Sequence, residues 1–552
     1  MPRKRVSSVF TQELGHLGLV AGLLKELEVS RRIDEVLEEK SQLTKHVTAG
    51  DCICAMIING LGFTNNAVYL VSRFFENKPL DRLIRPGVTF EHLNDDVLGK
   101  ALDTIADYDP TDFFANIVFP ICMKRKYRRR VARLDSTTFS VEGSYEGFGD
   151  SPDETPQIIS VTYGHSKQHR PDLKQVTLSM INSGAGGIPV WAEPLSGNSS
   201  DKTSFHETIA RVRAFQKSLN DDFEFLWVAD SALYSKDNLL KSSCNHHWIT
   251  RVPETIKEAK ELVSLPEEEA NWKDVDSNYR ISSHTSDYGG TRQRWLLVYS
   301  KDAYKREIAT LEKKIKKEHE SVSKQLWHLS NEAFGCPSDA EKKLAEVVAS
   351  IKYHKVTHKV HKQAVYKKVG RPKKDEKPES FRYSVTAKIK KDTEGISSIR
   401  TTKGRFILAT NHLDGRGLSA ERILREYKGL SKVERGFRFL KDPMFMMDQL
   451  FLTKPNRIAA LMSIMALCLF VYSIGEYEMR SFLKDSNKTL PNQLKKEIQN
   501  PTLRWVFKLM DGISVVNMQV GKYAQTEVSN LGSLQRRIVE IFGNFAKEIY
   551  AF

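Results

Sequence analysis

The sequence predicts an α/β protein in which a mixed sheet is flanked by helices, interrupted by a large insertion and followed and preceded by helical regions. Strand-like, β-branched segments begin at about residue 131 and alternate with helical segments in the order strands, helix, strand, helix, strand, which is typical of an α/β sheet. A long charged helical pattern then separates this region from a later strand and an amphipathic helix. The 552 residues are enough for two to four domains with a large core.

The first region, residues 1–125, is expected to be helical and to serve DNA binding or assembly. Apolar side chains recur at helical spacing in three segments, 19–37, 51–63 and 96–108. No helix-turn-helix with a glycine turn can be assigned within it.

The sheet is expected in two parts, residues 126–253 and residues 404–485. In the first part, the strand patterns cover residues 131–143, 157–166, 173–182, 188–195, 223–231 and 246–253. Helices are predicted at 203–219, where Ser204 and Glu207 have the spacing of a capping box, and around 235–242. The second part contains the strand 404–414 and the helix 425–441, "REYKGLSKVERGFRFLK".

Residues 254–403 are interpreted as an insertion. Residues 303–329 have coiled-coil-like spacing, so we expect a protruding helical hairpin with 338–352 as its return arm. A basic stretch, 352–374, is expected to be a linker, and a strand follows. The final region, 486–552, is predicted to be helical.

The charge of the chain is strongly positive and unevenly distributed. Lys and Arg number 84 against 69 Asp and Glu, a formal charge of +15. The segment "KRKYRRRVAR" (124–133) contains cations and no acid, as does the stretch 352–374. Such clustering indicates a polyanionic partner, most simply nucleic acid; a soluble protein with solvated lysine-rich faces is the alternative, and charge alone does not choose between them.

Neither cysteines nor membrane segments indicate an extracellular or membrane protein. The six cysteines are scattered and give a poor zinc pattern, so we expect small buried thiols in a reducing cytoplasm. The apolar segment 458–475 is short for a bilayer and broken by serines, which favours a buried core helix.

Three carboxylates stand out by their positions. Asp135 lies within the first strand, where a lone carboxylate is costly unless it is neutralised. Asp230 ends a later strand, and Glu434 lies on the helix after the insertion. Acids on these elements in this order are typical of a two-metal site for phosphoryl transfer. Taken singly, Asp230 is as well explained as a turn former, and Glu434 as a helical ion-pair partner of Arg438.

The same residues carry a resemblance to a known family. Tyr427, Glu434 and Lys441 have the spacing of a Tyr-x2-Arg-x3-Glu-x6-Lys signature, with Leu430 in place of the arginine. The segment "GHSKQHRPDLKQ" (164–175) is similar to the loop after the first acid in the same branch. Over about residues 130–480 the chain resembles the DDE transposases of bacterial insertion sequences, which have an RNase H-like catalytic domain.

The resemblance implies an enzyme that cuts and joins DNA strands with divalent metal ions. Asp135, Asp230 and Glu434 would hold two Mg²⁺ ions, with Mn²⁺ as an alternative, and Tyr427 and Lys441 would contact DNA phosphates. Cleavage at the element's ends would give a 3′-hydroxyl that attacks target DNA directly. The partners would be double-stranded DNA, namely terminal inverted repeats and target, and a second copy of the chain in a synaptic homodimer. The expected location is the cytoplasm, in association with the nucleoid.

Further cations are candidates for holding DNA. Lys432 is a candidate replacement for the missing signature arginine, although an ammonium cannot reproduce a bidentate guanidinium. Arg438 could belong to the same interface or to a solvated basic stripe. Lys167 and Arg170 lie in the loop that follows the first acid; the alternative there is a mobile surface loop.

Arg371 lies in "YKKVGRPKK" (366–374), a Gly-Arg-Pro core between lysines that resembles an AT-hook. A disordered basic linker is the alternative interpretation of so short a motif.

Two other functions remain open from the sequence. One is a catalytically silent, transposase-derived DNA-binding protein, against which the three retained acids argue. The other is an RNase H-like nuclease without strand transfer, against which the basic hairpin and the helical ends argue, since they suit an assembly that holds two DNA ends.

Overall fold

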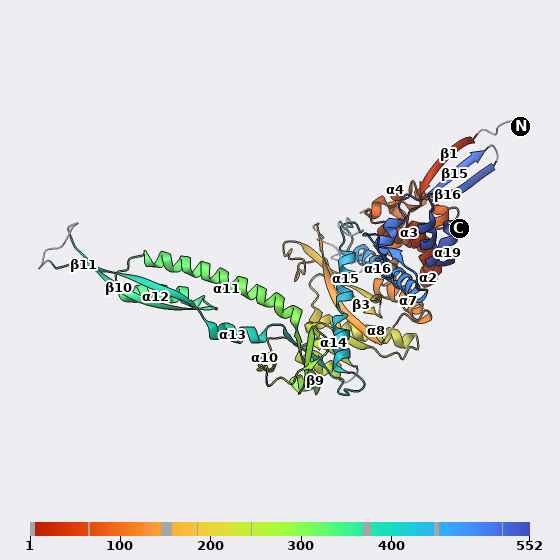
Figure 1. Cartoon of the computed structure of the whole chain (residues 1–552). Helices are drawn as coiled ribbons and strands as arrows, with labels where there is room; N and C mark the ends of the chain where they lie inside the picture. The colour runs from red at the N-terminus through yellow and green to blue at the C-terminus, as the bar shows by residue number, and fades with distance from the viewer. Residues whose placement is uncertain are drawn as a thin grey trace. The chain divides into compact units, whose positions relative to one another are not determined.

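The computed structural model describes residues 6–64, 67–128, 130–143, 145, 157–184, 186–243, 246–367, 377–445, 452–520 and 523–551. The chain divides into two compact units, both of which can be followed in Figure 1. The sheet unit contains residues 1–250, 289–291 and 422–552; the inserted unit contains residues 251–288 and 292–421.

The sheet unit is built around a mixed sheet with the strand order β4-β3-β2-β5-β6. Its strands are β2 (Val131–Val141), β3 (Lys174–Ser183), β4 (Ile188–Ser196), β5 (Leu226–Ala229) and β6 (Trp248–Arg251). The central strand β2 is antiparallel to β3 and parallel to β5, and β5 is parallel to β6. Three antiparallel strands that continue into parallel ones confirm the predicted RNase H-like α/β fold.

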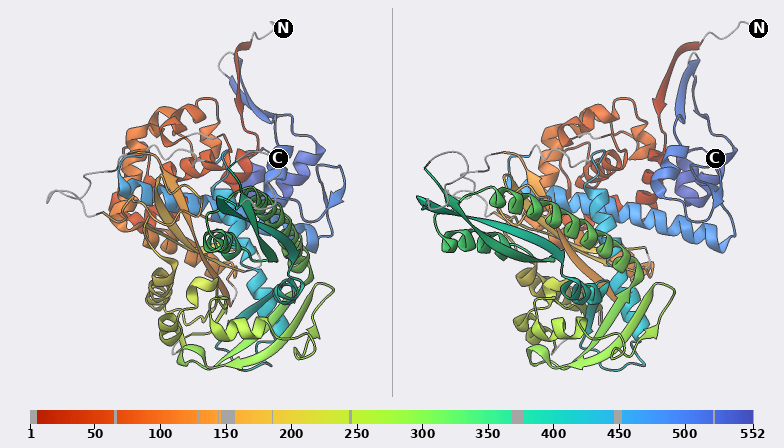
Figure 2. Two further views of the ribbon diagram at one scale, coloured as in Figure 1. Left: turned by 90° about the vertical axis from the view of Figure 1, so that its left-hand side faces the viewer. Right: turned by 60° about the vertical axis from the view of Figure 1, so that its left-hand side comes forward.

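Helices cover the sheet because they bring apolar stripes to it. α7 (Pro110–Lys124) and α16 (Pro455–Asp485) pack on β4, while α15 (Ser431–Leu440) packs on β2 and β3. α16 is apolar and long enough to cross a membrane by length and composition, but 89% of its most apolar window is buried inside the protein. Figure 2 shows it lying along the orange N-terminal helices, and it contacts α3 (Ala49–Leu61) and α6 (Asp95–Tyr108) there. This burial is that of the core helix expected from the sequence.

The two ends of the chain meet in the sheet unit. Besides the expected helices, such as α1 (Leu17–Glu26) and α19 (Gly543–Ile549), the ends form a sheet of β1 (Val6–Glu13), β15 (Ser514–Val520) and β16 (Tyr523–Ser529). α1 packs on α19, and the Tyr550 hydroxyl donates a hydrogen bond to the Gly15 carbonyl at 2.6 Å. These strands are not predicted from the sequence, because β1 finds its partner some five hundred residues away.

The inserted unit has four neighbouring antiparallel strands and a helical hairpin. The sheet order is β12-β9-β8-β7, formed by β12 (Arg405–Thr410), β9 (Gln293–Ser300), β8 (Tyr279–Ser286) and β7 (Lys273–Asp274). The helices are α10 (Lys257–Val263), α11 (Lys301–Ser330), α12 (Pro337–Ala349) and α13 (Thr393–Thr402). This unit encloses almost all of the predicted insertion 254–403 and also takes in β12, which we expect from the sequence to belong with the second part of the sheet.

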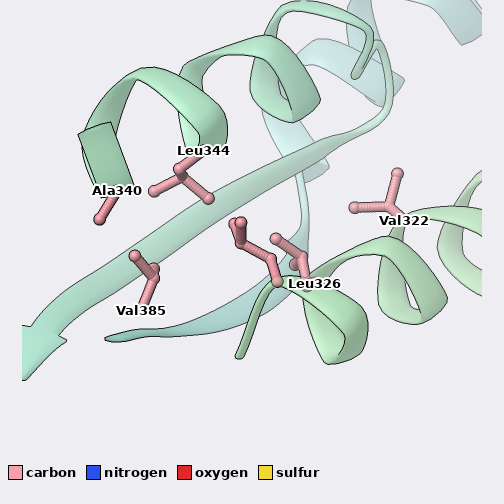
Figure 3. Close-up of a cluster of buried hydrophobic side chains, with 6 residues drawn as sticks. Val322, Leu326, Ala340, Leu344 and Val385 are labelled. Carbon is pink, nitrogen blue, oxygen red and sulfur yellow. The ribbon is translucent and has the colours of Figure 1, made fainter. Parts of the chain in front are cut away.

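The helical hairpin packs on a long two-stranded ribbon. β10 (His354–Val365) and β11 (Ser380–Lys391) pair antiparallel, and both α11 and α12 contact β11. Figure 3 shows the buried core between them, in which Val322 and Leu326 of α11 meet Leu344 of α12 and Val385 of β11. The predicted hairpin is therefore present, with a ribbon that the sequence does not reveal.

Three local predictions are wrong. Residues 157–166 form no strand beyond an isolated bridge between Thr162 and Gln175, because β2 and β4 already occupy the two edges of β3. The basic stretch 352–374 is not a linker over 354–365, where it forms β10. The single helix 425–441 is divided into α14 (Ala420–Lys428) and α15.

Candidate active site

Two of the predicted acids lie side by side where β5 ends beside the middle of β2. β2 and β5 run parallel, and their last paired residues are Leu134 and Ala229. The next residue is Asp135 in one strand and Asp230 in the other. Since adjacent strands are about 4.8 Å apart and paired positions share a face, the two carboxylates emerge together at this edge of the sheet.

Both aspartates are half-buried and are held by the backbone. Asp135 Oδ1 accepts a hydrogen bond from the Ser136 amide at 2.8 Å. Asp230 Oδ1 accepts one from the Ala232 amide at 2.9 Å, and the Asp230 carbonyl accepts the Thr250 hydroxyl at 2.5 Å. These contacts fix one oxygen of each carboxylate and tie the end of β5 to β6.

α15 runs along the face of β2 that carries Asp135. At the start of the helix, a Cβ added to Gly429 would lie only 2.3 Å from Arg133 Nε, and at its end Lys441 Nζ lies 5.3 Å from the ring centre of Phe139. In a strand, residues 133, 135 and 139 point to the same side. The contacts therefore place the start of α15 at Arg133 and its end at Phe139.

The lengths of α15 and β2 show beside which residue of β2 Glu434 lies. Twelve helical residues from Gly429 to Lys441 span about 18 Å, and six strand residues from Arg133 to Phe139 span about 20 Å. Asp135 lies about 7 Å beyond Arg133, which corresponds to four or five residues beyond Gly429. Glu434 is thus at the level of Asp135 along the strand.

Glu434 is exposed in the first turn of α15 and makes no ion pair with any residue that the structure describes. The alternative in which it serves as a salt-bridge partner of Arg438 is therefore not realised. Within the described ranges, however, no three His, Cys, Asp or Glu side chains are grouped closely enough to hold a metal ion. The structure brings the two aspartates together and leaves Glu434 at their level but outside such a group.

An ion pair to β2 holds the junction between α14 and α15 in place. Arg133 is 5% exposed and forms an ion pair with Glu426 of α14, at 2.6 Å between Nη2 and Oε2. Its guanidinium occupies the space beside Gly429, where any side chain would collide with it. Burial lowers the pKa of Arg133, while Glu426 opposes that shift. The pair fixes the α14–α15 junction to β2, two residues before Asp135.

Two lysines surround Asp135 from different segments. Lys167 Nζ donates hydrogen bonds to the carbonyl and the hydroxyl of Ser136, both at 2.8 Å, so this part of its loop is anchored on β2. Lys441 has its pKa lowered to about 8, first by burial and then by the charge of Lys167, whereas Asp135 acts to raise it. The two ammonium groups and the carboxylate form a compact site in which a phosphate could be held.

The remaining predicted cations lie in different surroundings. Arg170 forms an exposed ion pair with Asp172 in its own loop. Tyr427 is half-buried on α14, just before the break between the helices. Arg371 lies outside the described residues, so its predicted role is still a prediction.

Lys432 and Arg438 line a basic groove on α15. The groove has a volume of about 670 Å³. Burial lowers the pKa of Lys432, and the neighbouring charges of Arg133 and Arg435 lower it further. The two acids in the groove are paired, Asp442 with Arg504 and Glu476 with Arg480. Its charged side chains are Lys432, Arg435, Arg438, Asp442, Glu476, Arg480, Lys484 and Arg504.

The sequence reasoning did not single out Arg133 or Gly429. Arg133 lies between the apolar residues Ala132 and Leu134, two residues before Asp135, and an arginine in such a position indicates a buried ion pair. The role of Gly429 had no local signal, since its requirement for a small residue arises from Arg133, almost three hundred residues earlier.

Comparison with known proteins identifies the family of the chain. Residues 126–471 match the family model described as "Transposase DDE domain". The chain belongs to this family of DDE transposases. Residues 9–119 match a domain of unknown function, DUF4277. No curated protein matches the chain significantly.

One similar solved structure is a cryo-EM structure of the piggyBac transposase synaptic complex with hairpin DNA. It is 9% identical to this transposase, with a TM-score of 0.35, and the match covers 91% of this chain and 82% of that chain.

The donor chemistry of the site fits the divalent ions that DDE transposase domains generally use. Asp135 and Asp230 offer hard carboxylate oxygens from neighbouring strands, and a backbone amide holds one oxygen of each carboxylate. Glu434 supplies a third carboxylate at the same level, from a helix whose start is fixed by the Arg133–Glu426 pair.

Proposed function

We propose that this transposase cleaves DNA at the ends of an insertion sequence and joins the resulting 3′-hydroxyl to target DNA. The observation that carries the proposal is the register of β2 and β5, which brings Asp135 and Asp230 to one edge of the sheet, with α15 across it. Asp135, Asp230 and Glu434 would hold two Mg²⁺ ions, or Mn²⁺ in their place. Bound there, the ions supply activation of the attacking oxygen and charge stabilisation of the leaving oxygen.

The chain's own residues would hold and orient the DNA strand. Lys441 and Lys167 lie close to Asp135, so a scissile phosphate beside the aspartates would face two ammonium groups. Neither lysine needs to coordinate a metal to do this. Tyr427 is the further candidate for a phosphate contact, from α14.

The basic groove on α15 would continue the path of the DNA. Arg435, Arg438 and Lys484 make no ion pair with the part of the chain that is described, and Tyr472 and Tyr477 provide aromatic surface beside them. Cations interleaved with aromatic rings suit a nucleic acid strand. In this role Lys432 supplies part of the charge that the signature arginine, replaced by Leu430, does not.

Paired-end chemistry is expected to require a homodimer that holds two terminal repeats. The decisive assay incubates the full chain with Mg²⁺ and DNA that carries the repeats flanking its gene, then resolves cleaved ends and joined products. Both products are expected from the native protein, and neither from Asp135→Asn or Glu434→Gln.

Each alternative function has its own outcome in the same assay. Cleaved ends without joined product would identify a nuclease and reject strand transfer. Retarded DNA without any cleavage would identify a silent DNA-binding protein. Full activity of Asp135→Asn together with Glu434→Gln would overturn the assignment of the acids.

A further inference from the structure

The ribbon of β10 and β11 in the inserted unit has two chemically different faces. The strands pair without interruption from His354 opposite Lys391 to Val365 opposite Ser380. Because side chains alternate along each strand, every second pair of residues points to the same side. The ribbon contains seven Lys or Arg residues and no Asp or Glu.

The inner face is fixed against the helical hairpin. Val356 and Val360 of β10, with Val385 and Ile389 of β11, belong to the core that α11 and α12 close (Figure 3). Val356 lies opposite Ile389 and Val360 opposite Val385, so these two inner pairs are apolar. This packing determines which way the other face of the ribbon points.

The outer face is exposed and entirely polar apart from its last pair. It carries cations and small polar side chains in alternation, and none of these side chains is buried. Within the described residues, Lys355 is the only one of its cations with an ion pair, to Asp392 and Glu394. The outer pairs are Lys355–Lys390, Thr357–Lys388, Lys359–Thr386, His361–Ser384 and Gln363–Arg382.

Like charges placed opposite one another on a ribbon repel, and among the described residues only the ion pairs of Lys355 offset the repulsion between Lys355 and Lys390. An external polyanion would remove this cost. The outer pairs from Lys355 to Gln363 extend over about 27 Å, which is longer than half a turn of DNA. A two-stranded ribbon also has the width that the major groove of B-DNA admits.

We propose that the outer face of the β10–β11 ribbon binds double-stranded DNA at a site separate from the aspartate pair. Its lysines and Arg382 contact phosphates, and the intervening Thr, Ser and Gln side chains donate and accept hydrogen bonds. The absence of apolar side chains between residues 355 and 363 of this face excludes insertion into a membrane. Binding of this kind is largely independent of base sequence, because phosphate contacts dominate it.

The test measures the salt dependence of DNA binding by the full chain. Fluorescence anisotropy with a random-sequence duplex in EDTA separates binding from any cleavage. The outer-face variant carries Lys359→Gln, Arg382→Gln, Lys388→Gln and Lys390→Gln. The matched control removes the same charge from the exposed side of α11 in the same unit, with Lys305→Gln, Lys313→Gln, Lys314→Gln and Lys317→Gln.

The outer-face variant is expected to lower the slope of log Kobs against log salt by roughly 2 to 4, and to weaken binding more than tenfold at moderate salt. The control variant is expected to keep most of the native slope. An equal loss in both variants would mean that only net charge matters and would overturn the proposal. A loss confined to single-stranded DNA or RNA would overturn the assignment of duplex DNA.

A second measurement uses the unaltered protein and so does not depend on the folding of a variant. Duplex DNA is expected to protect Lys359 and Lys388 from acetylation, while Lys313 stays reactive. Equal modification of all three lysines with and without DNA would contradict the proposal. Because neither measurement requires catalysis, failure of the ribbon proposal and failure of the proposed cleavage and strand transfer give different results.

Discussion

α15 and the β10–β11 ribbon are both basic elements with one apolar face, yet they are built for different tasks. α15 buries Val433, Phe437 and Leu440 and keeps one acid, Glu434, among its cations. The ribbon buries valines and isoleucine and keeps no acid at all. A uniform positive face attracts a polyanion but does no chemistry, whereas a carboxylate aligned with Asp135 can take part in phosphoryl transfer. The position of acids therefore distinguishes the two regions better than their positive charge does.

The largest expected effect on activity is at the aspartate pair. Asp230→Asn is expected to lower DNA cleavage by roughly 10³-fold or more, because a divalent ion that loses a carboxylate stabilises the reacting oxygens less. DNA binding in EDTA should be unchanged. Asp237→Asn, an exposed acid on α9 (Lys236–Ser243), is the control and should cleave normally. Equal rates for the two variants would show that the edge of the sheet is not the catalytic centre.

The next largest effect is expected at the α14–α15 junction. Arg133→Met leaves the half-buried Glu426 with only its 3.9 Å ion pair to the exposed Arg425 and should destabilise the sheet unit by about 3 kcal/mol in urea unfolding. The double variant Arg133→Met with Glu426→Met should recover much of this loss, since the half-buried carboxylate is then removed as well. A single variant as stable as the native protein would show that the ion pair does not hold α15 on β2.

The packing beneath the ribbon provides a further test. Leu344→Ala removes a side chain that is 3% exposed, between the hairpin and β11, and should cost about 2–5 kcal/mol of local stability. Hydrogen exchange in α12 and β11 should accelerate, while exchange in β2 stays as it is. Val348→Ala on the same helix, 41% exposed, should change exchange little. Acceleration in β2 as well would show that the effect of this packing is not confined to the hairpin and the ribbon.

The smallest effect concerns the protonation of Lys441. Its pKa is lowered to about 8 in the folded protein, from an ordinary value of 10.5. Between these two pH values the unfolded chain binds more protons, so the contribution of Lys441 to stability is unfavourable below pH 8 and improves as the pH rises to about 10.5. The affinity for DNA should fall as the pH rises over this range, because the ammonium charge is lost above pH 8.

NMR titration of the Lys441 side chain tests whether Asp135 and Lys167 shift its pKa. Asp135→Asn should lower its pKa further, and Lys167→Gln should raise it. A pKa that neither substitution moves would separate Lys441 from the aspartate site.

Much of this fold follows from local patterns in the sequence. Periodicity located α3, α6 and α11, and β-branched runs located β2, β3 and β4, because the side chains that an element buries repeat with its own period; a continuous apolar segment located α16. The two aspartates could be chosen for the same reason, since a carboxylate in or at the end of a buried strand breaks the pattern, whereas Glu434 was chosen for its place on the helix after the insertion and in the family signature. The family signature added Tyr427 and Lys441.

Contacts between distant residues were decided by the tertiary structure alone. Position 429 accepts only a glycine because the guanidinium of Arg133 occupies the space where a side chain would lie. β1 is a strand because β15 offers it a partner, and the lysine-rich segment 354–365 is a strand because its valines reach the core of the helical hairpin. The sequence by itself thus determined which segments could form helices and strands and which acids were unusual. The tertiary structure decided which of those acids meet, which cations stay exposed and where only a glycine fits, because each of these depends on neighbours that are remote along the chain.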